Sequence, residues 1–250
     1  MPIDRIQLSQ ESLVAAIGDG WSPDQIDAVI ELLASSEGRL PSGARKLPSD
    51  LVKAVQREHL IMAMLKAASE LGYREANVQD VIDRARVSRP TFYEHFANKE
   101  DCFLAAFDTS AERLRDKVDM AALKGGDVWR DRMRYGLEEL LQFASSEPHT
   151  ARALIVEARA GSVDAVMRRV ELLDHFAGCL DTQVRELLPE APAFSMTTAT
   201  VIIGGVESLL YARLCKGEHE SLKSLLPSLM YFVVLPYEGH EAASEELAAR

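Results

Sequence analysis

The sequence has few cysteines and no long apolar run. Its three cysteines, Cys102, Cys179 and Cys215, are odd in number and widely spaced, without a C-x-x-C pair. This usage argues against a disulfide framework and favours a reducing, cytoplasmic setting. The best apolar run, Ala199 to Val206, is far short of the roughly 20 residues that span a membrane. The N-terminus lacks a long apolar block, so neither a signal peptide nor contact with a membrane is expected.

Catalytic patterns are also missing from the sequence. It contains no paired carboxylates placed for acid–base chemistry, no Gly-rich phosphate loop, no H-E-x-x-H and no G-x-S-x-G, so we expect neither enzyme activity nor a cofactor.

His175 and Cys179 stand four residues apart on one expected helix and can share a metal ion. Two ligands are too few, and no third is spaced to join them, so a buried histidine and a buried cysteine are the preferred interpretation and no metal site is predicted.

Negative charge dominates the chain, but unevenly. The net charge is −11. Residues 1–38 hold 1 basic and 7 acidic side chains, residues 39–100 hold 11 and 8, and residues 101–250 hold 16 and 24. The acidic parts would repel phosphate, so any contact with a nucleic acid is expected within the one positive block, 39–100.

The pattern of apolar residues predicts an all-α fold. Residues 1–38 form an extension with one amphipathic helix over 23–36, and 39–48 read as a basic arm or linker with two prolines. A three-helix unit follows over 49–98, a larger helical domain over 99–238 and a tail over 239–250. The expected helices are 49–71, 78–84, 89–96, 99–123, 128–146, 149–160, 163–188, 195–216 and 219–235, and Pro227 should kink the last or mark its true start.

The segment NVQDVIDRARVSRPTFYEHFANKED, residues 77–101, is the most informative part of the sequence. Asn77 and Ser88 can cap two short helices, and a break at 85–87 separates them. Phe92 and Phe96 are spaced i, i+4, so one face of the second helix should pack inward. A short helix, a tight turn and a second short helix form a unit that reads a major groove of DNA.

Residues 50–107 resemble the DNA-binding domain of the TetR-type (tetracycline-repressor-like) regulators. The match lies in V-x-x-V-I-x-x-A-x-V-S-x-x-T-F-Y-x-H-F-x-x-K-E-D, here Val78 to Asp101. The resemblance implies a recognition helix at 89–96 and phosphate contacts from Tyr93, His95 and Lys99. It also implies a larger C-terminal domain that binds a small molecule and dimerises through its last two long helices, 195–216 and 219–235. One departure is Arg86, where the family usually has Gly; a left-handed turn would cost Arg about 1 kcal/mol.

The expected partner is therefore a double-stranded DNA operator. Arginine can fork to guanine, threonine or proline can touch a thymine methyl, and the N–H groups at helix starts suit phosphate. The basic side chains at 39–48 can form an arm in the minor groove, although a solvated linker is about as plausible. The predicted DNA-binding residues are Arg45, Lys46, Asn77, Val78, Arg86, Ser88, Arg89, Pro90, Thr91, Tyr93, His95 and Lys99.

The C-terminal domain is expected to hold an unknown small-molecule effector and a homodimer interface. Aromatic and aliphatic side chains at helical spacing can line a cavity, although plain core packing is the commoner cause, and Arg159 can anchor an acidic ligand or form a salt bridge. The predicted ligand-binding residues are Phe103, Phe107, Trp129, Met133, Leu137, Phe143, Arg159 and Phe176. The apolar stripes predicted for the dimer interface, or else for internal packing, are Ile203, Val206, Leu210 and Leu214, and Leu222, Leu225, Leu226, Leu229, Met230, Val233 and Val234.

The sequence thus predicts a ligand-responsive repressor that binds a palindromic operator as a dimer. The alternative hypothesis, motivated by Arg86 and the overall negative charge, is a helical small-molecule-binding protein without operator control. An enzyme is the third hypothesis and has no catalytic constellation behind it.

Overall fold

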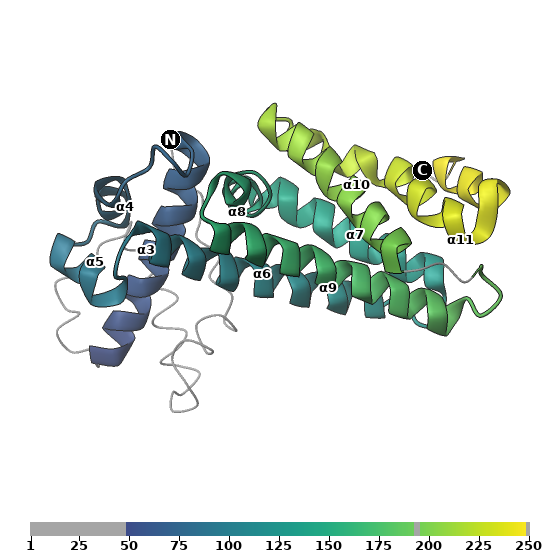
Figure 1. Ribbon diagram of the computed structural model, residues 1–250, viewed down its shortest axis with the longest axis horizontal. Helices are drawn as coiled ribbons and strands as arrows, with labels where there is room; N and C mark the ends of the chain where they lie inside the picture. Colours follow the sequence, from purple (N-terminus) through teal and green to yellow (C-terminus); the bar gives the residue numbers. More distant parts are fainter. Residues whose placement is uncertain (1–48, 193–195, 249–250) are drawn as a thin grey trace. The chain divides into compact units, whose positions relative to one another are not determined.

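The computed structural model describes residues 49–192 and 196–248 (Figure 1). Within these ranges the chain forms α-helices and short 3-10 helices and no strand, which confirms the all-α prediction. It divides into two compact units: residues up to Ala67 with Ala76–Phe103 form unit 1, and Ala68–Glu75 with the residues from Leu104 onward form unit 2. The helix expected at 23–36 and the arm with Arg45 and Lys46 lie outside the described residues.

The three helices expected before residue 98 are present, and unit 1 contains all of them except the last turn of the first. They are α3 (Ser49–Leu71), α4 (Val78–Ala85) and α5 (Arg89–His95). Gly72 ends α3 in a left-handed conformation, with φ +86°, and its N–H donates to the carbonyl of Ala68 at 2.9 Å. A glycine in this place closes a helix without the steric cost that a Cβ would bring.

The core of unit 1 explains why such short helices are stable. Helices of seven or eight residues are marginal in water by themselves, so tertiary packing must hold them. The side chains that supply this packing are almost fully buried and come from all three helices: Leu60, Ile61, Met64, Val81, Ile82, Phe92 and Phe96. Burying an aromatic or aliphatic side chain of this size contributes about 1.5–3 kcal/mol.

Unit 2 is built from long helices joined by short turns (Figure 1). Pro148 occupies the first turn of its helix and Ser162 caps another, both as expected of helix starts. The elements are α6 (Lys99–Leu123, which begins in unit 1), α7 (Trp129–Ser146), α8 (Pro148–Ile155), η2 (Glu157–Ala160), α9 (Val163–Leu187), α10 (Met196–Cys215), η3 (His219–Leu225) and α11 (Leu226–Ala248).

The last part of the chain differs from the prediction. The single helix expected over 219–235 begins as the 3-10 helix η3, and the α-helix starts only at Leu226. Pro227 lies in its first turn, where a missing N–H costs nothing, so it marks the true start as one of the two expectations had it. The tail expected from residue 239 is helical as far as Ala248, after a break at Gly239 with φ 86°. Glycine permits that break, and the second segment returns to pack with Ala243 buried.

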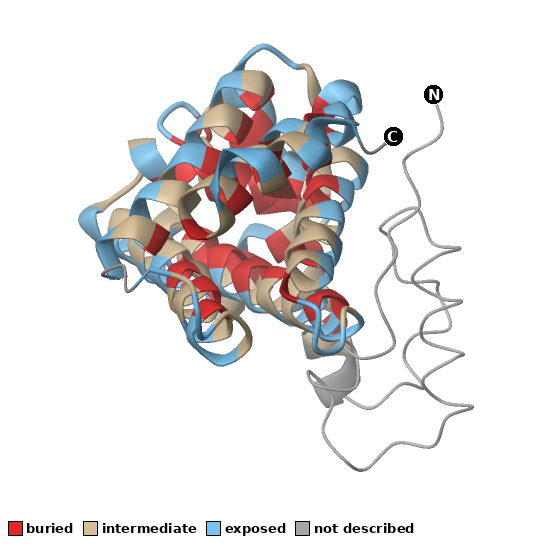
Figure 2. Cartoon of the chain, turned by 90° about the vertical axis from the view of Figure 1, so that its right-hand side faces the viewer, coloured by how far each residue is buried: buried red, intermediate tan, exposed pale blue. Residues whose placement is uncertain are grey.

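Two apolar clusters form the interior of unit 2, and Figure 2 shows the buried residues on the sides of the helices that face one another. One cluster gathers around Phe143, Leu154 and Leu210, and the other around Trp129 and Met230. Three buried carboxylates accompany this core, and each is matched by arginine: Glu157 by Arg152, Glu207 by Arg159 and Arg169, and Glu246 by Arg130 and Arg134. A buried carboxylate needs such partners because burial without them is costly.

Helix α10 corrects one expectation from the sequence. No stretch was expected to have the dimensions of a membrane span, yet Met196–Cys215 is long and apolar enough by length and composition, with a mean hydropathy of 1.3. One such helix is weak evidence for a membrane span, because core helices of soluble proteins can have the same length and hydropathy. Only 28% of it is buried within the chain, so much of an apolar helix remains uncovered.

Candidate nucleic-acid interface

The first element of the interface is the start of α4. The side chain of Asn77 accepts hydrogen bonds from the N–H groups of Gln79 (2.8 Å) and Asp80 (3.3 Å), and the Asp80 carboxylate accepts from the Asn77 N–H (2.9 Å). This reciprocal arrangement is a capping box, and it confirms Asn77 as the cap. Because the capping side chains occupy these N–H groups, the helix start is less open to a phosphate than the sequence led us to expect.

The turn between α4 and α5 forms with Arg86 in the left-handed region. Its φ and ψ are 54° and 38°, and it is the one residue other than glycine with positive φ among the described residues. The N–H groups of Arg86 and Val87 both donate to the carbonyl of Ile82. The departure from glycine therefore leaves the turn intact, at a cost of about 1 kcal/mol for a side chain in this conformation.

Helix α5 is anchored on one side and open on the other. Ser88 caps it by accepting from the N–H of Thr91 at 3.2 Å, and Pro90 lies in its first turn. Phe92 is fully buried and Phe96 nearly so, which confirms the inward face predicted from their spacing. Packing on this face fixes the rotation of the helix, so Tyr93 and Glu94, which lie between the two phenylalanines, face solvent.

The exposed side of α5 carries the groups that suit DNA. Arg89 and Tyr93 are both exposed, and the Arg89 guanidinium lies 5.8 Å from the centre of the Tyr93 ring. The Tyr93 ring in turn meets Phe92 edge-on at 5.3 Å, so the tyrosine is held from the core side. This stacking restrains the arginine near the first turn of the helix, where a planar fork is available for a base edge or a phosphate.

His95 and Lys99 are more engaged within unit 1 than their predicted role requires. Burial lowers the pKa of His95; the negative charge of Glu94 opposes this effect, and the positive charges of Arg57 and Lys53 add to it. The charged form of the ring is therefore disfavoured. The Lys99 ammonium donates to the carbonyl of Ala76 at 2.8 Å, which ties the start of α6 to the residue before the α4 cap.

Basic and acidic side chains are equal in number in the helix-turn-helix region, but they differ in what they contact. Residues 49–100 hold 8 basic and 8 acidic side chains, so the excess of the block 39–100 comes from its first ten residues. Two of the acids serve internally, since Asp80 completes the capping box and Asp83 accepts from Gln79 at 2.8 Å. Arg86 and Arg89 lie exposed beside them.

The residues predicted for an effector site do not surround one hollow. Phe103 belongs to unit 1, and Phe107, Phe143 and Phe176 pack in or against one apolar cluster of unit 2. Trp129 and Met133 belong to the other cluster, and Leu137 packs against both. Arg159 pairs with Glu207 and stacks on Tyr211 at 4.1 Å, so a salt bridge, one of its two expected roles, is present.

Two open hollows in unit 2 are lined by other residues. The larger, about 450 Å³, lies along α6, α7 and α9, and the smaller is about 350 Å³. The larger one contains the pair His175 and Cys179, joined there by Asp119 from α6. Sequence reasoning missed this third residue, because Asp119 precedes His175 by 56 positions and lies on another helix.

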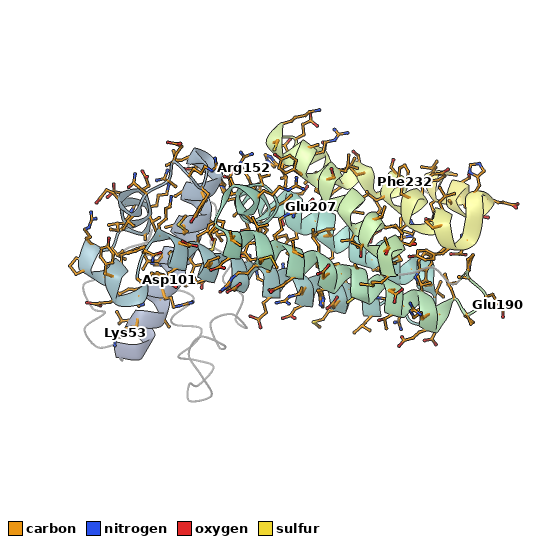
Figure 3. All side chains as sticks on the ribbon, in the orientation of Figure 1. Lys53, Asp101, Arg152, Glu190, Glu207 and Phe232 are labelled. Carbon is orange, nitrogen blue, oxygen red and sulfur yellow. The ribbon has the colours of Figure 1, made fainter. Side chains whose placement is uncertain are left out.

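The dimer stripes predicted from the sequence are mostly internal. Val206, Leu210 and Leu214 of α10 are buried within the chain, as are Met230 and Val233 of α11. The uncovered side of α10 carries small residues at i, i+4, i+7 and i+11: Val201, Gly205, Ser208 and Ala212. Phe232, labelled in Figure 3, is a large apolar side chain that α11 leaves exposed, at 62%.

Helices α4 and α5, with the turn at Arg86 between them, form a helix-turn-helix. Residues 60–106 match the family model of the bacterial regulatory proteins, tetR family. The chain is 27% identical over 114 residues to the HTH-type transcriptional activator FasR of Mycolicibacterium smegmatis, covering 46% of this chain and 52% of FasR. It is 30% identical over 109 residues to the repressor KstR of the same organism, covering 42% and 53%. The chain thus spans about half the length of these relatives.

Solved structures share the fold. The fatty acid degradation regulator FadR of Bacillus halodurans has a TM-score of 0.63 at 18% identity, covering 72% of this chain and 94% of that one. FadR of Bacillus subtilis, solved with stearoyl-CoA, has a TM-score of 0.61 at 17% identity, covering 71% and 97%. The match of residues 60–106 to the family model confirms the resemblance seen in the sequence, and that resemblance lies in the helix-turn-helix region.

Proposed function

We propose that this chain is a cytoplasmic, ligand-responsive transcriptional regulator that binds a palindromic operator as a homodimer. The observation that carries the proposal is α5, which buries Phe92 and Phe96 and presents Arg89 and Tyr93 to solvent. In a two-fold dimer, two such helices would enter successive major grooves roughly 34 Å apart. Phosphate contacts would supply most of the affinity, so binding should weaken as salt rises.

Binding to DNA is tested by fluorescence anisotropy with fragments from the chain's own genomic neighbourhood at low and moderate salt. Saturable binding to one palindrome, with a steep salt dependence, is expected. Absence of binding at low salt would overturn the proposal. The matched control is a DNA of the same length and composition in shuffled order.

Within the interface, Arg89 and Lys99 are assigned different roles. Arg89→Ala should reduce the preference for the operator over shuffled DNA, because a base contact contributes about 1–3 kcal/mol of discrimination. Lys99→Ala should weaken binding to both DNAs alike, by losing a phosphate contact and the bond to Ala76. Thermal unfolding of both variants separates binding from folding, and equal effects on specificity would contradict the assignment.

The homodimer is proposed to form through the uncovered side of α10 together with Phe232. A Cβ added at Gly205 meets nothing within 4 Å in the chain. Gly205→Glu should therefore leave the folded subunit intact while disrupting a close helix–helix contact between subunits. Sedimentation should report a monomer for this variant and a dimer for Met167→Arg, a matched exposed position on α9. A Gly205→Glu protein that stays dimeric would place the interface elsewhere.

The effector is proposed to bind in unit 2 and to favour one spacing of the two DNA-binding heads. The solved structure of FadR from Bacillus subtilis contains stearoyl-CoA, so long-chain acyl thioesters are the first class of effector to test. The seven predicted residues that lie in unit 2 stay candidates, and binding would require the apolar clusters around Phe143 and Trp129 to open. Release of the operator on addition of acyl-CoA, measured by anisotropy, supports this class; unchanged binding at saturating ligand removes it.

The alternative function is a helical small-molecule-binding protein without operator control. Its motives in the sequence are Arg86 and the overall negative charge, and the left-handed turn formed at Arg86 weakens the first of them. A gel-shift assay with genomic fragments distinguishes the two, because only the regulator retards a specific fragment.

A further inference from the structure

The larger hollow of unit 2 contains a compact set of metal-ligating side chains. The Asp119 carboxylate on α6 lies 3.0 Å from the His175 Nε2 on α9, and the Cys179 Sγ lies 3.7 Å from the same nitrogen. The Sγ is 3.9 Å from the other carboxylate oxygen of Asp119. All three residues are partly buried and line the hollow, so they are reachable from solvent without being loose on the surface.

These distances are close to those of a coordinated ion. Ligand atoms bound to tetrahedral zinc at about 2.0–2.3 Å lie about 3.3–3.6 Å from one another. The nitrogen–oxygen distance of 3.0 Å and the two sulfur distances of 3.7 and 3.9 Å differ from that range by only a few tenths of an ångström. The three ligand atoms are therefore spaced nearly as they would be around one bound ion.

The types of ligand select the metal. One sulfur, one imidazole nitrogen and one carboxylate oxygen suit a borderline-soft divalent cation, above all zinc, and do not suit Ca²⁺ or Mg²⁺, which take oxygen ligands. We propose that Asp119, His175 and Cys179 bind one zinc ion, with the fourth coordination position open to the hollow of unit 2.

One neighbouring feature supports the site. Gln183, one helical turn further along α9, lines the same hollow, and its Oε1 is buried without a hydrogen-bond partner. An acceptor there can receive a hydrogen bond from a water molecule in the open position.

The other cysteines provide internal controls. Cys102 is enclosed in unit 1, where its Sγ faces the Leu60 carbonyl at 3.8 Å and burial raises the pKa of its thiol to about 12. Cys215 is exposed on α10 and outside the Asp119 cluster. A thiolate–metal signal that depends on Cys179 and not on Cys215 therefore reports this site alone.

The test is a titration of the chelator-treated full chain with Co²⁺, followed by displacement with Zn²⁺. We expect one Co²⁺ per chain and a sulfur-to-cobalt charge-transfer band in the near ultraviolet. Cys179→Ser should abolish the band, His175→Gln and Asp119→Asn should weaken the affinity about tenfold or more, and Cys215→Ser should change neither. Circular dichroism checks that each variant is folded.

No charge-transfer band in the wild-type chain, or a band that survives Cys179→Ser, would overturn the proposal. Affinities unchanged in both His175→Gln and Asp119→Asn would do the same, since they would leave the cysteine as the sole ligand. Because the readout is metal binding by the free protein, these results are separate from the outcome of the operator-binding experiments.

Discussion

Units 1 and 2 differ in where their polar side chains lie and in what those side chains contact. In unit 1, α5 leaves Arg89 and Tyr93 exposed on a helix whose other side is buried. In unit 2, charged side chains from different helices pair with each other, as Glu207 does with Arg159 and Arg169. The exposed groups of unit 1 are available to a partner, whereas those of unit 2 are largely used to join helices. A functional surface is therefore visible directly in unit 1, and in unit 2 it is found only in what the helix packing leaves uncovered.

The largest expected effect is in the core of unit 1. Phe92→Ala removes a fully buried ring from beneath the recognition helix and should lower the free energy of unfolding of this unit by about 3–5 kcal/mol. Denaturant unfolding measures the loss, and operator binding should disappear with it. Met120→Ala, at an exposed position of α6, is the control and should change stability little. Equal losses in both variants would contradict the assignment of Phe92 to the core.

A change at Glu207 examines the pairing in unit 2. Glu207→Gln keeps the shape and removes the charge that two arginines share, so unit 2 should lose about 2 kcal/mol of stability. Asp181→Asn breaks the Arg185–Asp181 pair, whose arginine is largely exposed, and should cost well under 1 kcal/mol. If the two variants are equally stable, the buried ion pairs of Glu207 contribute no more to the stability of unit 2 than an exposed pair does.

Replacing Arg86 separates strain from function in unit 1. Arg86→Gly relieves a left-handed arginine and should raise the stability of unit 1 by about 1 kcal/mol. If Arg86 also contacts phosphate, the same variant should bind operator more weakly and with a smaller salt dependence. A stability that falls instead would mean that contacts of the side chain outweigh the strain.

The smallest expected effect is a dependence of unit 1 on pH. Burial lowers the pKa of both His59 and His95 below that of an unfolded histidine. Below about pH 6.5, therefore, the unfolded chain binds protons that the folded chain does not, and stability falls as the pH falls. Unfolding measured at pH 7.5 and pH 5.5 should show this loss, and His59→Leu should reduce it. His240→Gln, at an exposed position, should leave the difference between the two pH values unchanged.

The interface of unit 1 was largely predictable, because its signals are local. Capping by Asn77 and Ser88 depends on residues two or three positions away, and the inward face of α5 follows from the spacing of Phe92 and Phe96. The bond from Lys99 to the Ala76 carbonyl was not predictable, since nothing in a spacing of 23 residues indicates it. The roles of these residues toward DNA stay predictions.

The sequence predicted most helices of unit 2, but it did not predict which face of each helix is covered by other helices. The apolar stripe of Val206, Leu210 and Leu214 looked equally suited to a dimer interface and to internal packing, and the structure shows that it is internal. The metal-ligating cluster shows the same limit, because Asp119 joins His175 and Cys179 only when α6 and α9 lie side by side.

The sequence by itself determined the all-α fold, the helix-turn-helix and the side of α5 that faces solvent. Each depends on interactions within one or two helical turns, which the order of residues specifies. Tertiary structure alone decided which apolar stripe is covered, which carboxylate each arginine pairs with, and where the larger hollow brings Asp119 to His175 and Cys179. These features depend on contacts between helices far apart in the chain, and a periodic pattern states that a face is apolar without stating what will cover it.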